Sequence, residues 1–489
     1  MASTAPASPL PGRPPWSGAP RWLLGLTLLI GGCSFAPPLK VPEVPAATAY
    51  KEMGPWTRAE PADQLPRDSW WTVYDTAEIA ELERRLIAGN PSLAAAVANY
   101  AQAKALSDQA RAGLFPSVSA NAGVSRARES QHAPLIGPTT PHYYDDNEVG
   151  GSVSYELDLW GQIRNEVAAG RATAAATAAD LENARLSLLA QLVDDYIQLR
   201  GFDREGAILD DTVAAYAHAL NLTQLRHGAG ISAGLDVAEA ETQLDGARSQ
   251  VAQILAQRAL MEHAIAALLG VSASTFSIQP AIVVIKLPEI PTGIPTNLLQ
   301  RRPDIAAAER RMIAANANIG VARAAYFPSL TLGLQGGFQS TSFSNWLSAP
   351  SSFWAIGPNA LLSVFDGGLR RAQVAQARAQ FDGAAANYRG TVVTAFQQVE
   401  DSLASLNHYY DAAQQEKAAV GAAQRTLDLS MALYRQGASD YLTVVTSQTA
   451  LLQAQVQSLN LDTLQLQASV DLIRALGGGW EDASRVAAR

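Results

Sequence analysis

Six histidines and one acidic run are the side chains that could act as metal ligands or acid–base catalysts. The histidines include His142, His218, His227 and His263, whose spacing fits no pattern of metal ligands. The run YYDDNE (143–148) could bind a cation, but a polar extracellular loop explains it better. The sequence contains no glycine-rich phosphate loop and no nucleophile motif. We therefore expect no metal site, no cofactor and no catalytic residues, and predict that the chain is not an enzyme.

The only cysteine, Cys33, is the candidate for covalent modification. It follows Arg21, the apolar run WLLGLTLLI and two glycines, an order typical of a secretory signal peptide. The apolar run is shorter than the about 20 residues of a membrane-spanning helix. Residues 30–33, Ile-Gly-Gly-Cys, resemble a bacterial lipobox, in which the thiol receives a diacylglyceryl group and the cysteine becomes the mature N-terminus. The alternative is a signal peptide that ends near a cysteine by chance.

The predicted location is the outer membrane. Ser34 follows the cysteine, whereas aspartate there usually retains bacterial lipoproteins in the inner membrane. Two or more acyl chains on Cys33 would bind outer-membrane lipid stably. No stretch after Cys33 approaches about 18 consecutive apolar residues, so we predict no transmembrane helix. The net charge of −9 argues against nucleic acid as a partner, because a nucleic-acid-binding protein carries a basic face.

The second half of the sequence repeats the first. ARAGLFPSVSANAGVS (110–125) and ARAAYFPSLTLGLQGG (322–337) both join a helix-like run to an alternating, strand-like run through Phe-Pro-Ser. Residues 88–117 also pair with 300–329, and residues 225–244 with 434–452. We therefore predict a duplicated unit of about 210 residues with the order helix, strand, strand, long helix, helix.

This repeat divides the chain into six predicted segments. They are a signal peptide (1–32), a lipidated, extended N-terminal segment (33–75), the first repeat (76–270), a proline-rich linker (271–300), the second repeat (301–476) and a C-terminal tail (477–489). The strands are expected at about 116–160 and 328–366, and turns between helices at about 226–236 and 435–444.

The predicted strands have one apolar and one polar face. In residues 149–159 the apolar face carries Val149, Gly151, Val153, Tyr155, Leu157 and Leu159. An ordinary half-buried strand and a strand of a membrane barrel both give this alternation. Aromatic residues favour the barrel because they gather at both strand ends, as in a bilayer. One set is Phe115, Trp160, Tyr326, Phe327 and Phe365; the other is Tyr143, Tyr144, Phe343, Trp346, Phe353 and Trp354.

Phe115 and Phe327 would mark the inner face of the membrane. Pro116 and Pro328 would end each helix and begin each strand, where a missing N–H is tolerated. Four strands cannot close a barrel, and open edges in lipid leave backbone groups unpaired at several kcal/mol each. Several copies of the chain must therefore complete the barrel.

Two proline-free runs, 162–227 and 368–436, predict helices of about 100 Å. Gly228 and Gly437 are placed to cap them in the left-handed conformation. Ser232 or Asp236, and Ser439 or Asp440, could cap the returning helices. Apolar residues spaced three and four apart predict a coiled-coil seam along each returning helix. The seams are Val237, Ala240, Leu244, Ala247, Val251, Ile254, Arg258, Met261, Ile265, Leu268, and Leu442, Val445, Thr449, Leu452, Val456, Leu459, Thr463, Leu466, Val470, Ile473.

Together these features resemble the TolC-like outer-membrane factors of tripartite efflux systems, most closely the lipidated NodT/OprM branch. The resemblance rests on the lipobox, LLQRRPDIAAAERRMIAANANIGVARAAYFPS, the turns LRHGAGISAGLDV and YRQGASDYLTVV, and the ending ALGGGW. It implies a mainly α fold with a membrane β part: a homotrimer whose 12-strand β-barrel continues into a long α-helical barrel through the periplasm. Segments 33–75, 271–300 and 477–489 would form a belt around the helices.

The resemblance also implies site residues. The glycine turns would be hairpin tips that dock the periplasmic adaptor (membrane fusion protein), through Arg226, Gly228, Leu235, Asp236, Arg435, Gly437, Asp440 and Leu442. Turn chemistry alone would also explain the glycines. By position, Leu442 and Thr446 would line a periplasmic constriction. Thr446 stands where relatives often carry an acid, so the narrowing is expected to depend on Leu442 and Tyr441.

The predicted function is a passive exit duct. It would pass small molecules, such as drugs or toxic compounds, from an inner-membrane pump and the adaptor to the outside. The acidic balance and Glu156 and Asp158 on the polar strand face predict a mild preference for cations. The alternative is a lipid-anchored periplasmic coiled-coil scaffold or adhesin without a pore, which would not need apolar strand faces bounded by aromatics.

Overall fold

The structure is a computed structural model that describes residues 34–43, 50–52, 70–74, 76–130, 132, 141–288, 290 and 302–478. The predicted signal peptide and Cys33 lie outside the described residues. So do residues 291–300 of the predicted linker and residues 479–489 of the predicted tail.

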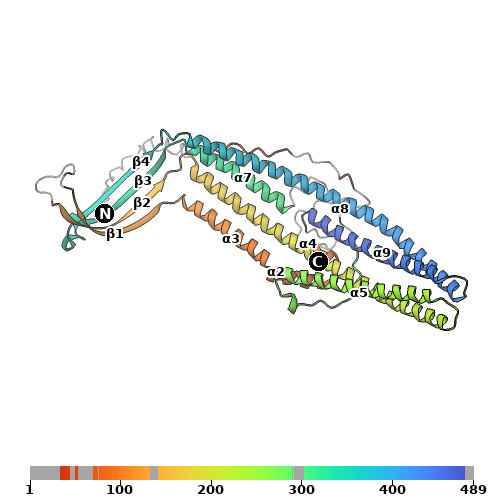
Figure 1. The fold of residues 1–489 in the computed structure, drawn as a ribbon. Coiled ribbons are helices and arrows are strands. Elements are labelled where there is room, and N and C mark those ends of the chain that lie inside the picture. The colour runs from red at the N-terminus through yellow and green to blue at the C-terminus, as the bar shows by residue number, and fades with distance from the viewer. Residues whose placement is uncertain are drawn as a thin grey trace, which may run out of the picture. The chain divides into compact units, whose positions relative to one another are not determined.

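The described chain contains the predicted element order twice (Figure 1). The first set is α3 (Pro91–Ala112), β1 (Ser117–Arg128), β2 (Tyr143–Glu156), α4 (Gln162–Gly228) and α5 (Gly234–Leu268). The second set is α7 (Pro303–Ala324), β3 (Ser329–Ser340), β4 (Ser352–Leu361), α8 (Leu369–Arg435) and α9 (Tyr441–Ala475). Matching helices have equal lengths of 22, 67 and 35 residues. The duplication therefore extends to the lengths of the helices.

Shorter elements flank these sets. They are the 3₁₀ turn η2 (Trp70–Tyr74), helix α2 (Ala77–Gly89), and the 3₁₀ turns η3 (Ala273–Thr275), η4 (Phe343–Asn345) and η5 (Ala349–Ser351). Among the described residues, no helix combines the length and the apolar character needed to cross a membrane.

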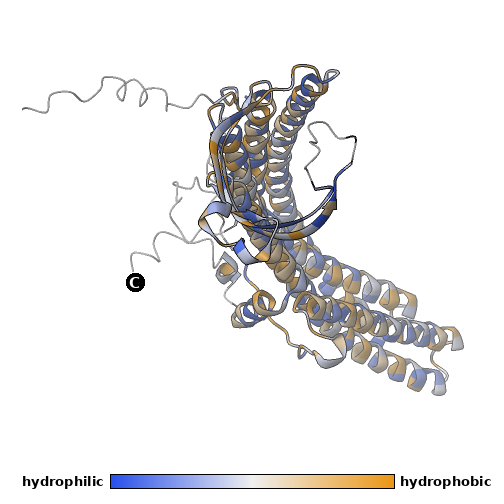
Figure 2. Ribbon diagram, turned by 90° about the vertical axis from the view of Figure 1, so that its left-hand side faces the viewer, coloured by the Kyte–Doolittle hydropathy of each residue, from blue (hydrophilic) through white to orange (hydrophobic). Residues whose placement is uncertain are grey.

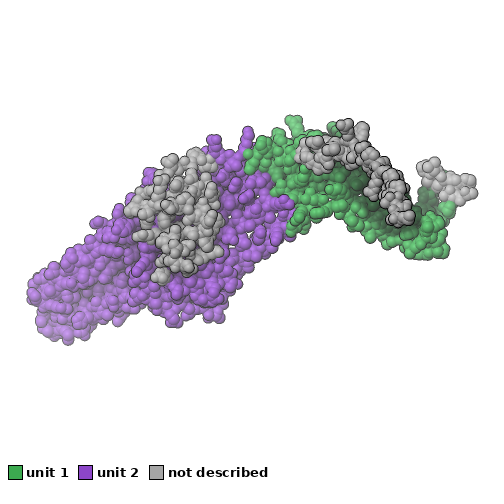
Figure 3. Space-filling model, turned by 180° about the vertical axis from the view of Figure 1, so that it is seen from behind, with its two compact units in different colours: residues 1–39, 108–169, 315–380 green, residues 40–107, 170–314, 381–489 purple. Residues whose placement is uncertain are grey.

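The chain divides into two compact units, each built from both repeats (Figure 3). The first comprises residues 1–39, 108–169 and 315–380 and contains the sheet. Its four antiparallel strands follow the order β1-β2-β3-β4, so the central pair, β2 and β3, joins the two repeats. Val118, Val153, Leu334 and Ile356 lie in register across one face. The next row, on the opposite face, is Ser119, Ser152, Gln335 and Ala355. The predicted alternation is confirmed within the strands, but β2 ends at Glu156, so Leu157 and Leu159 lie beyond it. Apolar and polar residues both occur along the strands (Figure 2).

The second unit, residues 40–107, 170–314 and 381–489, holds the main hydrophobic core. Leu86 of α2, Leu192 of α4, Ile265 of α5, Val399 of α8 and Val470 of α9 are all at most 1% exposed. The core therefore ties both repeats together. The predicted seam of α5 is confirmed at Ala240, Leu244, Ala247, Ile254 and Ile265, which are buried. On α9 the seam is buried at Val445, Leu459, Thr463, Leu466, Val470 and Ile473, but its predicted first residue, Leu442, is 54% exposed.

Candidate functional site

The turn between α4 and α5, the first hairpin tip, closes α4 with a Schellman motif. Gly230 has φ of 73°. Its N–H donates to the His227 carbonyl (2.9 Å), and the Ile231 N–H donates to the Arg226 carbonyl (2.8 Å). The prediction that Gly228 is the left-handed residue is therefore wrong, because Gly228 is the last residue of α4. Two glycines stand two residues apart, and local propensity does not choose between them.

The start of α5 also differs from the prediction. Ala233 is the N-cap residue, and no side chain caps the helix. Neither Ser232 nor Asp236 has the predicted capping role. Asp236 lies inside the first turn, where a negative charge favours the helix dipole.

The turn between α8 and α9, the second hairpin tip, agrees with the prediction. Gly437 has φ of 75°, and its N–H donates to the Tyr434 carbonyl (3.0 Å). Asp440, not Ser439, caps α9: its Oδ1 accepts from the Thr443 N–H (3.1 Å) and the Thr443 hydroxyl (2.6 Å). These bonds hold the pKa of Asp440 below its ordinary value, so the exposed carboxylate stays charged.

The two predicted docking arginines lie in different surroundings. Arg226 crosses to the other hairpin, where its Nη1 donates to the Tyr434 carbonyl (2.8 Å) and its guanidinium carbon lies 4.6 Å from the Tyr434 ring centroid. Tyr434 is only 2% exposed, and its hydroxyl lies 3.4 Å from the buried Thr223 Oγ1. Arg435, by contrast, is exposed. Arg226 therefore joins the two hairpins, while Arg435 presents its charge to solvent.

Of the three predicted constriction residues, Tyr441 does not fit a lining position. Its side chain is 1% exposed and packs 5.3 Å from Tyr434 between ring centroids. Burial raises its pKa to about 12. Leu442, on the next position of α9, is 54% exposed, and Thr446 one turn later is also exposed. Tyr441 thus supports the helix from inside, and Leu442 and Thr446 remain the surface candidates.

The first hairpin tip carries an apolar patch that sequence analysis found only in part. Leu235, predicted to dock the adaptor, is 67% exposed. Leu225 at the end of α4 and Ile231 in the turn are also 67% and 66% exposed. Apolar residues beside the glycines of this turn were the sequence feature that could have predicted the whole patch. Three large apolar side chains exposed together are typical of a contact surface.

The Phe-Pro-Ser motifs stand where helix meets strand. Phe115 and Pro116 separate α3 from β1, and Phe327 and Pro328 separate α7 from β3. The N–H of each phenylalanine still donates to the carbonyl three residues earlier, Ala112 (3.0 Å) or Ala324 (2.9 Å). Each proline then ends the helical hydrogen bonding.

The sheet exposes its apolar face within one chain. Val118 is 76% exposed, Ile356 62% and Trp354 77%. On the opposite face, Asn121 Nδ2 donates to Glu148 (2.8 Å) and Gln339 Nε2 donates to Asp146 (3.0 Å). Water would not favour so large an apolar surface, so this face requires lipid or protein against it.

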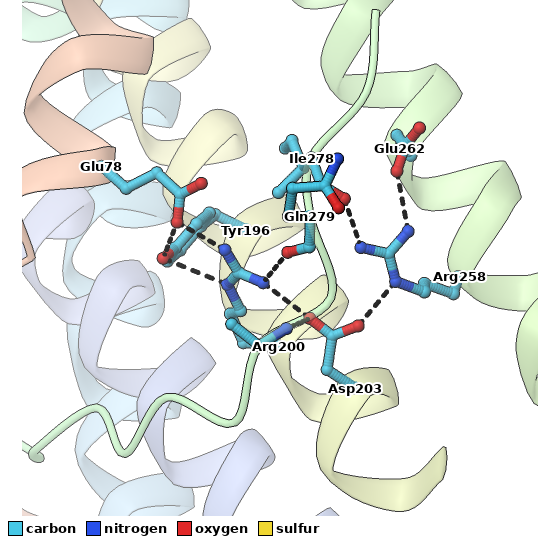
Figure 4. A network of polar contacts seen from close by, with 9 residues as sticks. Glu78, Tyr196, Arg200, Asp203, Arg258, Glu262, Ile278 and Gln279 are labelled. Atoms are coloured by element: carbon cyan, nitrogen blue, oxygen red, sulfur yellow. Dashed lines mark hydrogen bonds and ion pairs between the residues drawn. The ribbon is translucent and has the colours of Figure 1, made fainter. Parts of the chain in front are cut away.

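A buried ionic network in the second unit was missed by sequence analysis (Figure 4). Asp203 accepts from Arg200 Nη1 (2.7 Å), Arg258 Nε (2.6 Å) and the Ala281 N–H (3.2 Å). The Asp203 side chain is 1% exposed and that of Arg200 4%. Arg200 also contacts Glu78 (2.5 Å). The network connects α2, α4, α5 and the segment that follows η3. The only sequence feature that pointed to this network was Arg258, a charged residue within the predicted apolar seam of α5.

No group of three or more His, Cys, Asp or Glu side chains within the described residues could hold a metal ion. His227, next to the first hairpin tip, contacts the Ser232 carbonyl through Nδ1 (2.9 Å). Its role there is to hold the turn.

The geometry can be compared with known proteins. Residues 82–271 and 294–478 match the outer membrane efflux protein family. The probable efflux pump outer membrane protein TtgC of Pseudomonas putida is 31% identical over 457 residues, which cover 92% of this chain and 94% of the relative. Outer membrane protein OprJ of Pseudomonas aeruginosa is 31% identical over 473 residues, covering 96% and 97%.

Two solved structures share the fold. The outer-membrane channel OprN superposes with a TM-score of 0.84 at 28% identity, covering 92% of this chain and 100% of that one. The Campylobacter jejuni CmeC outer membrane channel superposes with a TM-score of 0.86 at 25% identity, covering 93% and 98%. The family match includes both repeats, the sheet and both hairpin tips. The chain therefore belongs to the outer membrane efflux protein family, and it is an outer-membrane efflux channel.

Proposed function

We propose that three copies of the chain form the exit duct of a tripartite efflux system. The observation that carries this proposal is the open four-stranded sheet, with an exposed apolar face and a polar face. Three such sheets joined edge to edge pair every strand, which removes the unpaired backbone groups that lipid does not tolerate. A twelve-strand barrel with its apolar face outwards then encloses a polar channel.

The cargo is proposed to be small molecules such as drugs or toxic compounds. Relatives are named as an antibiotic efflux pump outer membrane protein and a toluene efflux pump outer membrane protein, both from Pseudomonas putida. The long helices would carry the duct through the periplasm towards an inner-membrane pump. Acylation of Cys33 would add a lipid anchor to the barrel.

The two hairpin tips are proposed to dock a periplasmic adaptor. Leu225, Ile231 and Leu235 offer an apolar surface on the first tip, and the exposed Arg435 and Asp440 offer charges on the second. Leu442 and Thr446, exposed near the start of α9, are proposed to line the closed constriction. Because Thr446 carries no charge, this constriction would close by apolar contact instead of by a carboxylate ring.

Ion conduction tests the duct directly. Purified protein in planar lipid bilayers is expected to conduct poorly until Leu442→Ser loosens the constriction, after which conductance rises. The reversal potential should favour cations, because Asp146, Glu148 and Glu156 lie on the polar strand face. Absence of conductance in both proteins would contradict the duct, as a scaffold without a pore predicts.

The hairpin tips can be tested with two arginines. Arg435→Ala is expected to weaken adaptor binding about tenfold without changing the melting temperature, because the side chain is exposed and a docked arginine contributes 1 kcal/mol or more. Arg226→Ala should instead lower the melting temperature, because the contacts to Tyr434 are lost. Adaptor affinity by surface plasmon resonance and thermal melts measure both.

The matched control is Arg248→Ala, which removes an exposed pair with Asp245 on α5, away from the hairpin tips. Arg248→Ala should change neither the adaptor affinity nor the melting temperature. Equal loss of adaptor affinity in Arg248→Ala and Arg435→Ala would show that the second hairpin tip is not a specific docking surface.

A further inference from the structure

The first described residues after Cys33 lie in a shaped site on the first unit. Three long-range hydrogen bonds hold Ser34–Pro37 against the start of α4 and the end of α7. They run from Ser34 Oγ to Asn165 Oδ1 (3.0 Å), from Arg323 Nη1 to the Phe35 carbonyl (3.1 Å) and from Asn316 Nδ2 to the Pro37 carbonyl (2.9 Å). Asn165 and Asn316 are 5% and 9% exposed, so water does not compete strongly for these bonds.

An aromatic stack adds to the hydrogen bonds. The rings of Phe35 and Phe327 lie 4.6 Å apart between centroids, at an angle of 5°. On the other side of Phe327, the Trp160 ring lies at 4.8 Å and 23°. Trp160 is itself fixed, because its Nε1 donates to the Pro328 carbonyl (2.8 Å). The phenylalanine of the second Phe-Pro-Ser motif thus stacks on both Phe35 of the N-terminal segment and Trp160.

The site also depends on a glycine, because position 320 has no room for a side chain. A Cβ at Gly320 would lie 2.5 Å from Asn165 Nδ2 and 2.9 Å from the Ala36 nitrogen, closer than side-chain carbons approach other atoms. Gly320 lies inside α7, four residues before its last residue, Ala324, and glycine inside a helix costs stability relative to alanine. Its presence therefore has a packing reason: it lets the N-terminal segment approach α7.

The first repeat does not reproduce this site. Residues 88–117 pair with 300–329, so Lys104 stands where the second repeat has Asn316, and Asp108 stands where it has Gly320. Both are exposed. Phe115 is 61% exposed, against 38% for Phe327. The two Phe-Pro-Ser joints are nearly the same in sequence, yet only the second is built to receive the N-terminal segment.

We propose that the second helix-to-strand joint is the seat of the lipid anchor, and that Phe35, Asn165, Asn316 and Gly320 are its positioning residues. Ser34 is joined directly to Cys33 by a peptide bond, so seating Ser34–Pro37 fixes the point from which the acyl chains leave the protein. The lipid is then attached at a fixed position beside β3 and not at the end of a flexible segment. This inference rests on the proposed acylation of Cys33, but the seat itself is a property of the polypeptide.

A disulfide tests the seat. Ser34→Cys and Asn165→Cys, whose native side chains touch, are combined with Cys33→Ser, which removes the only native thiol. Mild oxidation should produce an intramolecular disulfide, seen as faster migration on a non-reducing gel. The control pair is Ser34→Cys with Asp108→Cys. Asp108 occupies the position in the first repeat that corresponds to Gly320 in the second. Equal disulfide yields in the two pairs, or a disulfide-linked dimer, would overturn the proposal.

The aromatic stack gives a second, graded measurement. Phe35→Ala or Phe327→Ala in the Ser34→Cys, Asn165→Cys chain should slow disulfide formation about fivefold, because a stacked pair contributes about 1 kcal/mol. Phe115→Ala, which removes the corresponding ring of the first repeat, should leave the rate unchanged. Equal rates in all three variants would contradict the seat.

The same pair is also oxidised in the chain that keeps Cys33, where acylation consumes the native thiol. This chain covers the case in which Cys33→Ser fails to fold. With Leu442→Ser added to this chain, an acylated, conducting protein that forms no disulfide between positions 34 and 165 would overturn this inference and leave the duct standing. A disulfide in a protein that neither carries lipid nor conducts, even with Leu442→Ser, would support the seat and contradict the proposed function.

Discussion

Replacing Leu334 with arginine is expected to prevent insertion of the sheet into the outer membrane. Leu334 lies in the middle of β3, in one row with Val153 and Ile356 on the apolar face. An arginine on the lipid side of a barrel strand costs about 2–4 kcal/mol at the bilayer midplane. Three copies in the proposed trimer would multiply that cost.

The adjacent residue provides the matched control. Gln335 points to the opposite face, in register with Ser152 and Ala355, so Gln335→Arg should face water and insert normally. Membrane fractionation and trypsin resistance of the sheet report insertion for both variants. If the two arginines behave alike, then the apolar face does not contact lipid and the barrel proposal fails.

Asp203→Ala is expected to cause the largest loss of stability in the helical unit, about 3–5 kcal/mol. The carboxylate lies between Arg200 and Arg258 and also accepts the Ala281 N–H. Its removal leaves two guanidinium groups close together, and the Arg200 side chain is only 4% exposed. Arg200 keeps its ion pair with Glu78 and Arg258 keeps its pair with Glu262, but the two guanidinium groups lose the carboxylate that lies between them. Breaking a buried ion pair in this way costs far more than the loss of a surface ion pair.

The control for this prediction is one residue away. Arg204 contacts Asp462 at 3.4 Å, but both side chains are nearly 30% exposed, so Arg204→Ala should cost less than about 1 kcal/mol. Urea titration followed by circular dichroism compares the two variants. Similar midpoints for Asp203→Ala and wild type would show that the network does not hold α2, α4 and α5 together.

Much of the fold follows from local features of the sequence. The absence of proline over residues 162–227 and 368–436 predicted α4 and α8 to within a residue of their observed ends. The three–four spacing predicted the buried lines of α5 and α9, and the alternation predicted both strand faces. These features are read along one element, so one sequence is enough to find them.

The wrong or incomplete predictions concern side chains whose burial or partner depends on residues far away in the sequence. Tyr441 and Leu442 are adjacent apolar residues, and only the packing of Tyr441 on Tyr434 decides which one is buried. Arg226 and Arg435 look alike in sequence, yet Tyr434 engages only the first through its ring and carbonyl. The seat for Ser34–Pro37 joins residues from three distant segments, and no local pattern signals it.

The equal helix lengths carry a consequence for how this chain can change over evolution. α4 and α8 each have 67 residues, and α5 and α9 each have 35. A heptad inserted into α4 alone would lengthen one arm of its hairpin by about 10 Å, and α5 would then be too short to pair with all of it. A matching insertion in α5 would make the two arms of the first hairpin equal again. The first hairpin would then be about 10 Å longer than the second hairpin, α8 and α9. Length can therefore drift only when four insertions or deletions occur in concert, so point substitution is the main route by which the two repeats diverge.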